Sequence, residues 1–169
     1  MKLTKISVRL LGAGQIIFTA AYFGYLLFVG LSWGFTPRMV QLFVTDSIFL
    51  FFILSAIGLL LIKTWGWWVT VILYGKLLLS KFIGTGTEWF LISTGLIAEP
   101  LDWGRATADL GILLLYAGVI ILLFTHCFRK LFGLTERRGR LMIMTAMGVI
   151  VLYAVYFTVT LALVLAMGF

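Results

Sequence analysis

The stretch from Leu42 to Ile83 constrains the fold most, because it joins two long apolar runs through a short polar break. The first run, Leu42–Ile62, holds one charged residue, Asp46, and a helix needs about 20 apolar residues to cross the hydrocarbon core of a bilayer. The break is Lys63–Gly66, and the second run is Gly66–Ile83. Backbone groups facing lipid must pair within their own segment, so both runs must be helical. We predict a transmembrane helical hairpin here.

The rest of the composition agrees with a membrane protein. Of 169 residues, 63% are hydrophobic and 11% are charged, whereas charged residues reach about 25% in soluble domains. The sequence therefore predicts one all-α transmembrane domain over residues 1–169. The net charge of +7 would favour nucleic acid as the partner of a soluble protein, but basic residues beside apolar spans set orientation and attract anionic lipid. We expect no nucleic-acid partner.

The apolar runs predict a bundle of five spans, at residues 10–33, 42–62, 66–83, 107–125 and 141–168. Thr36-Pro37 is typical of a helix start and places the outer end of the second span at Pro37. Pro100 and Asp102 mark a similar start before the fourth span, and that helix is expected to continue beyond residue 125 and stop near Gly133.

Two connections remain between these spans: an outer one at 84–106 and a basic one at 126–140. The apolar segment Trp89–Ala98 of the outer connection is too short to cross a bilayer as a helix. We expect it to be interfacial or re-entrant.

The orientation follows from the positions of lysine and arginine, which favour the cytoplasmic side. Nine share one side of the predicted bundle: Lys2, Lys5, Arg9, Lys63, Arg129, Lys130, Arg137, Arg138 and Arg140. Four fall on or toward the other side: Arg38, Lys76, Lys81 and Arg105. We predict a cytoplasmic N-terminus and an outer C-terminus, with Trp67 and Trp68 in the cytoplasmic aromatic belt. The short basic loops fit a bacterial inner membrane.

Lys76 is the most informative single residue, because an unpaired cation near the bilayer centre costs about 2.5–3.5 kcal/mol. The side chain either snorkels to the outer headgroups or pairs with an acid on another helix. Asp109 has Arg105 four residues earlier, within reach on a helix. Asp46 is therefore the expected partner of Lys76. Lys81 lies about 140° around the helix from Lys76, at about 100° per residue, so the two do not form one anion clamp.

These five side chains, Asp46, Lys76, Lys81, Arg105 and Asp109, form a candidate intramembrane polar cluster on the outer side, for binding or for structure alone. Asp46 and Asp109 also invite comparison with intramembrane aspartyl chemistry. Lipoprotein signal peptidases have a comparable length, but their motifs contain asparagine and this chain has none. We expect no catalytic residue.

The chain also has few side chains of the kinds that bind transition metals. The chain holds one cysteine, Cys127, and one histidine, His126. Neighbours on a helix diverge by about 100°, so the two are poorly set to share a metal. We expect no metal and no cofactor, and a haem held between subunits is the alternative left open.

Two further patterns concern partners. Arg129, Lys130, Arg137, Arg138 and Arg140 are candidates for contact with anionic lipid or an acidic partner, although the positive-inside rule alone accounts for them. The pairs Gly111/Gly118 and Ala162/Ala166 make smooth stripes suited to helix contact, more often inside a bundle than between subunits.

We therefore expect a non-catalytic accessory or scaffolding subunit of a larger membrane complex. Its partners would be membrane lipids and other membrane subunits or a second copy of the chain. The alternative is a small transporter, a channel or a lipid-binding module, in which Asp46, Lys76 and Asp109 line an outward-facing polar pocket.

Overall fold

The computed structural model describes residues 2–96 and 102–167, and every regular element in these ranges is a helix. The elements are α1 (Lys2–Trp33), α2 (Pro37–Thr45), the 3₁₀ turn η1 (Asp46–Leu50), α3 (Phe51–Leu60), α4 (Thr64–Ser93), α5 (Trp103–Leu123), α6 (His126–Leu131) and α7 (Arg138–Met167). Together they supply five helical segments that are long and apolar enough to cross a membrane. The prediction of an all-helical bundle with five such spans is confirmed.

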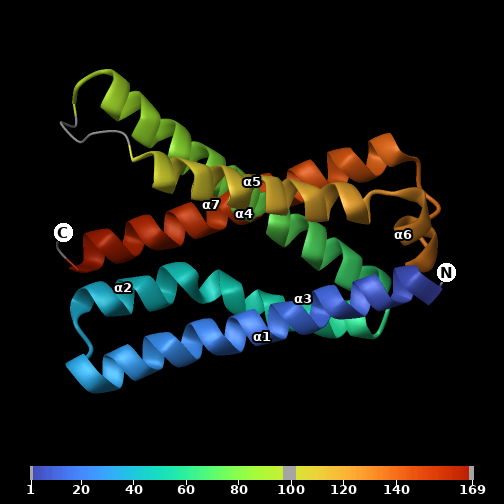
Figure 1. The fold of residues 1–169 in the computed structure, drawn as a ribbon, viewed down its shortest axis with the longest axis horizontal. Coiled ribbons are helices and arrows are strands. Elements are labelled where there is room, and N and C mark those ends of the chain that lie inside the picture. The colour runs from blue at the N-terminus through green and yellow to red at the C-terminus, as the bar shows by residue number, and fades with distance from the viewer. Residues whose placement is uncertain (1, 97–101, 168–169) are drawn as a thin grey trace.

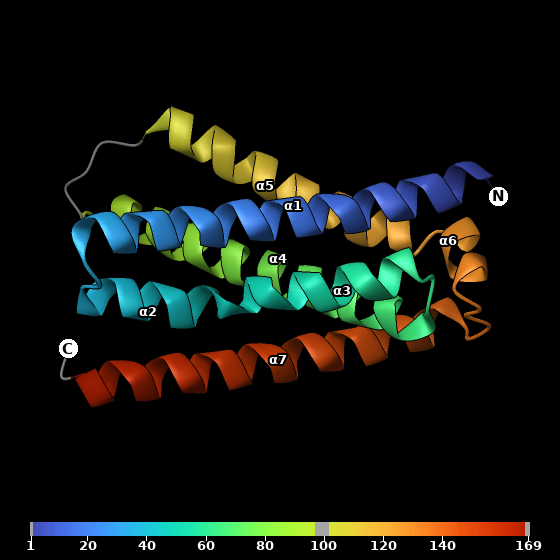
Figure 2. The same ribbon diagram turned by 90° about the horizontal axis from the view of Figure 1, so that it is seen from below.

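The long helix α4 is the central element of the bundle. It packs against α3, α5 and α7, while α1 packs against α3. Figure 1 shows α4 and α7 crossing at an angle, with α1, α2 and α3 on the side of the bundle away from α5. In Figure 2, turned by 90°, these three helices are seen between α5 and α7. The start of α1, the α3–α4 turn and α6 lie at one end of the bundle, and the last turn of α7 lies at the other, near α2.

The α3–α4 turn brings two glycines into backbone contact. Lys63 N–H donates to the carbonyl of Gly58 at 2.9 Å, and Ile62, with φ of 53°, takes the left-handed conformation that usually ends a helix. The chain then reverses so sharply that a Cβ built on Gly66 would lie 2.3 Å from the carbonyl carbon of Gly58. The predicted hairpin is present, and glycine is required at its closest approach.

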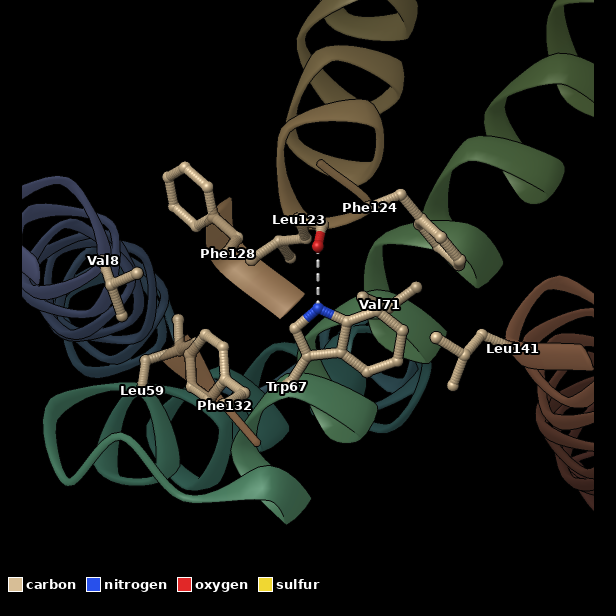
Figure 3. Close-up of a cluster of buried hydrophobic side chains, with 9 residues drawn as sticks. All are labelled: Val8, Leu59, Trp67, Val71, Leu123, Phe124, Phe128, Phe132 and Leu141. Atoms are coloured by element: carbon tan, nitrogen blue, oxygen red, sulfur yellow. Dashed lines mark hydrogen bonds between the residues drawn. The ribbon is translucent and has the colours of Figure 1, made fainter. Parts of the chain in front are cut away.

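The main core lies at the same end of the bundle as this turn. Trp67 is fully buried there, and its indole N–H donates to the carbonyl of Leu123 at 2.9 Å (Figure 3). Side chains from α1, α3, α4, α5, α6 and α7, and from the residues that follow α5 and α6, surround it or extend the cluster: Val8, Leu59, Val71, Leu123, Phe124, Phe128, Phe132 and Leu141. The prediction that Trp67 lies in an aromatic belt is wrong, because its indole fills the interior and finds its hydrogen-bond acceptor there.

The third span is longer than the sequence suggested. α4 continues through Ser93, so the expected end at Ile83 is wrong. Trp89–Ser93 extends this helix, which corrects that part of the interfacial or re-entrant expectation for Trp89–Ala98, and residues 97–98 lie outside the described ranges. The helix persists past Gly84 because polar side chains of its last turns pair with α5.

Two expected helices are interrupted. The second span changes to a 3₁₀ turn at Asp46, between α2 and α3. The fourth span ends at Leu123, and α6 is a separate short helix after Thr125. Two predicted helix boundaries agree with the structure. The Thr36 hydroxyl caps α2 by accepting from Met39 N–H at 3.3 Å, and Gly133, with φ of 69°, follows the end of α6.

Candidate functional site

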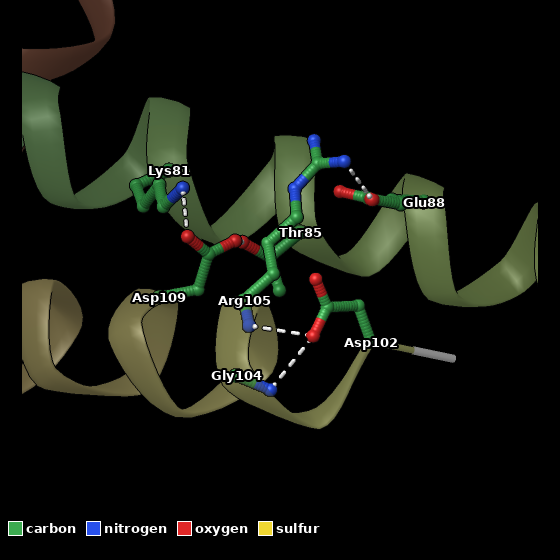
Figure 4. A network of polar contacts seen from close by, with 7 residues as sticks. All are labelled: Lys81, Thr85, Glu88, Asp102, Gly104, Arg105 and Asp109. Atoms are coloured by element: carbon green, nitrogen blue, oxygen red, sulfur yellow. Dashed lines mark hydrogen bonds and ion pairs between the residues drawn. The ribbon is translucent and has the colours of Figure 1, made fainter. Parts of the chain in front are cut away.

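The α4–α5 ion-pair cluster is formed by Lys81, Thr85, Glu88, Arg105 and Asp109 (Figure 4). It joins the second half of α4 to the first half of α5. Lys81 Nζ lies 2.5 Å from Asp109 Oδ1, and Thr85 donates to the other carboxylate oxygen at 3.2 Å. Arg105 Nη1 lies 3.2 Å from Glu88 Oε1. Two cations meet two carboxylates, so the cluster is internally neutral and leaves no net charge for a ligand.

These pairings correct one sequence prediction. Asp109 pairs with Lys81 on the neighbouring helix rather than with Arg105 on its own helix. Arg105 lies one turn before Asp109, near the start of α5, and reaches Glu88, which the extra turns of α4 bring alongside. The first turn of α5 is capped by Asp102, whose carboxylate accepts from the backbone N–H groups of Gly104 and Arg105 at 2.9 and 3.3 Å.

Asp46 has a different environment. The Tyr22 hydroxyl on α1 donates to its carboxylate. Within the described residues no carboxylate lies within 4 Å of Lys76, so the predicted ion pair between Asp46 and Lys76 is not formed. Asp46 makes no contact with Lys76, and the two charges interact only through space.

Lys76 instead lines a small pocket between α2, α4 and α7, which we call the Lys76 pocket. Its ammonium lies 4.9 Å from the centroid of the Tyr156 ring, within range of a cation–π interaction. The pocket has a volume of about 160 Å³ and is lined by Thr45, Lys76, Ser80, Tyr153, Tyr156, Phe157 and Thr160. The Tyr156 hydroxyl lies 3.3 Å from that of Ser47. The structure thus places Lys76 among hydroxyl groups, apart from Lys81 and Asp109.

A buried polar network in the middle of the bundle escaped the sequence analysis. The Ser55 hydroxyl donates to Gln15 Oε1 at 3.0 Å and lies 2.6 Å from the Thr70 hydroxyl, which donates to the Gly66 carbonyl at 2.6 Å. The network ties α1, α3 and α4 together, as polar groups between transmembrane helices commonly do. In the sequence, Gln15 is the one amide side chain of the first apolar run, and this residue could have indicated a buried polar network.

The basic residues of the 126–140 loop gather around a second pocket, which we call the basic pocket. It has a volume of about 550 Å³, and its basic lining residues include Arg129, Lys130, Arg137 and Arg138. Arg140 lies beside it and pairs with Glu136 at 3.2 Å. Four of the five candidate contact residues therefore share one concave surface, and His126 also lines it, while Cys127 is exposed nearby.

The glycine pair on α5 packs against no other element among the described residues. A Cβ built on Gly111 or Gly118 would meet no atom within 4 Å, and both residues are exposed. Ala162 and Ala166 on α7 are also exposed. The expectation that these stripes serve internal packing is wrong, because α5 turns its opposite face, with Asp109 and Leu123, toward the bundle.

Comparison of the chain with protein-family models, with curated proteins and with solved structures found no match.

Proposed function

We propose that this protein is a non-catalytic membrane protein that acts as an accessory or scaffolding subunit of a larger membrane assembly. The observation that carries the proposal is a stripe on the exposed face of α5. Gly111 and Gly118 are seven residues apart there, and neither has an atom of another element close to it. Small residues at such spacing let a second helix approach closely, and close approach is a main source of helix association in lipid.

The polar groups support a structural role. Lys81, Asp109, Arg105 and Glu88 bridge α4 and α5, and Asp102 caps a helix. His126 is exposed on α6, at the opposite end of the bundle from the ion-pair cluster. A histidine that exchanges a proton with Asp46 or Asp109 would have to lie within hydrogen-bond reach of that carboxylate. His126 lies too far away for this role.

Replacing Gly118 with leucine tests the stripe. We expect the variant to fold like the wild type, because the new side chain meets open space, but to lose its place in the assembly. The measurement is the mass of the complex purified in mild detergent. Gly84→Leu, at another open glycine, is the matched control and should keep the wild-type mass. A wild-type protein that purifies as a lone stable monomer would contradict the proposal.

We also propose that the N-terminus is cytoplasmic and the C-terminus outside, in a bacterial inner membrane. The support is the gathering of basic residues at the end that holds the N-terminus, Lys63 and the basic pocket. Tags at both termini should respond differently to a protease added outside the cell: the C-terminal tag is cut and the N-terminal tag is protected. Equal protection or equal cutting of both tags would overturn this orientation.

A second candidate function is a lipid-binding or transport module. The Lys76 pocket favours it, because intramembrane ionisable residues commonly mark binding or transport sites. Asp109 is no longer part of this candidate site, since it pairs with Lys81.

A further inference from the structure

We infer that the Lys76 pocket binds the anionic group of a membrane lipid, either a carboxylate or a phosphate, whose acyl chain lies along α7. This inference rests on the second candidate function. It names the ligand class that the geometry of α2, α4 and α7 would accept.

The charge of Lys76 is the first step of the argument. A lysine within a spanning helix carries a cost unless an anion or water offsets it. Among the described residues the charge of Lys76 is only partly compensated. Asp46 accepts a hydrogen bond from Tyr22 on α1, and the Lys76 ammonium has only the face of the Tyr156 ring beside it. An anion entering the pocket would meet the ammonium directly.

The lining of the pocket suits such an anion. Besides Lys76, five residues that line the pocket carry a hydroxyl group, Thr45, Ser80, Tyr153, Tyr156 and Thr160, and each hydroxyl is able to donate a hydrogen bond. The volume of about 160 Å³ leaves room for a carboxylate or a phosphate group. Because the pocket is open on one side, the rest of the lipid would lie outside it.

An apolar pocket beside the α4–α7 crossing would hold the acyl chain of the lipid. It has a volume of about 440 Å³ and is lined by Gly75, Leu79 and Phe82 of α4 and by Ala146, Val149 and Ile150 of α7, among others. On α7, its lining residues and those of the Lys76 pocket follow one another at spacings of three and four, so they share one helix face. On α4 the two sets lie on different sides of the helix, since Gly75 and Lys76 are about 100° apart, so the path between the pockets follows α7. An acyl chain along this face would carry its anionic end at Lys76.

The experiment measures lipid retained by the purified full-length protein, using native mass spectrometry after equilibration with oleate, dioleoyl phosphatidylglycerol or dioleoyl phosphatidylcholine. We expect the wild type to retain one anionic lipid in preference to phosphatidylcholine. Lys76→Met should lower that retention about fivefold or more, since one basic residue contributes about that factor at an anionic surface. Lys76→Arg should preserve it. Retention of oleate alone identifies a carboxylate ligand, and retention of phosphatidylglycerol alone identifies a phosphate.

Two further variants separate the site from a general effect of charge or folding. Lys63→Met removes the same charge at an exposed position just before α4 and should leave lipid retention unchanged, because Lys63 lies outside the pocket and outside the ion pairs of the described residues. Ser80→Leu keeps Lys76 but fills the pocket, and should lower retention like Lys76→Met. Equal retention by the wild type and Lys76→Met would overturn the inference. A wild type that retains all three lipids equally would overturn the anion site alone, while one that retains none would also overturn the lipid-binding module.

Discussion

Replacing Gly66 with alanine is expected to cost about 3 kcal/mol or more of stability, at the upper end of the effect of overpacking. The added methyl group would lie 2.3 Å from the carbonyl carbon and 2.5 Å from the Cα atom of Gly58. Both are backbone atoms of α3, so no side-chain rotation relieves the clash, and α3 and α4 must separate. Because the Thr70 hydroxyl also bonds to the Gly66 carbonyl, the buried network in the middle of the bundle would be disturbed as well. Unfolding by a denaturing detergent, followed by circular dichroism, measures the change.

Gly84→Ala is the matched control on the same helix. A Cβ there meets no atom within 4 Å, and alanine is about 1 kcal/mol more favourable than glycine within a helix. This variant should be as stable as the wild type or slightly more so. Wild-type stability in Gly66→Ala would show that the two helices do not touch at this position.

Replacing Trp67 with alanine should have the other large effect, a loss of about 3–5 kcal/mol. The indole is fully buried at the centre of the main core and contributes the hydrogen bond to the Leu123 carbonyl. Truncation leaves a cavity among α1, α4, α5 and α7 and leaves that carbonyl, at the end of α5, without its partner. The same detergent unfolding experiment measures the loss.

Trp67→Phe separates the two contributions, because phenylalanine retains much of the apolar volume but has no N–H group. Loss of the hydrogen bond alone should cost about 1 kcal/mol. Trp103, which is 71% exposed, provides the control, and Trp103→Ala should change stability by less than about 0.5 kcal/mol. Similar losses for Trp67→Ala and Trp103→Ala would mean that the core is not assembled around Trp67.

The number of spans was predictable because length and apolarity determine what can cross a bilayer. The start at Pro37 and the stop at Gly133 were predictable because a capping hydroxyl before proline and a left-handed glycine act locally. The continuation of α4 past Gly84 was not. Its last turns look like a polar connection until Lys81 and Glu88 are placed beside Asp109 and Arg105 on α5.

The partners of charged residues were harder to predict because they depend on how helices tilt and cross. The sequence gives the depth of Lys76 and Asp46 but not the direction in which each helix presents them. The crossing of α4 and α7 directs Lys76 toward Tyr156, and α1 supplies Tyr22 to Asp46. The separation of Lys76 from Lys81 followed from helix geometry alone and agrees with their different surroundings.

The position of the main core near the α3–α4 turn has a mechanical consequence. Six helices are joined there by side chains that exclude solvent and lipid, so that end acts as a pivot for the spans. Small rotations about it would produce larger sideways displacements farther along α4 and α7, where the Lys76 pocket lies about midway along α4.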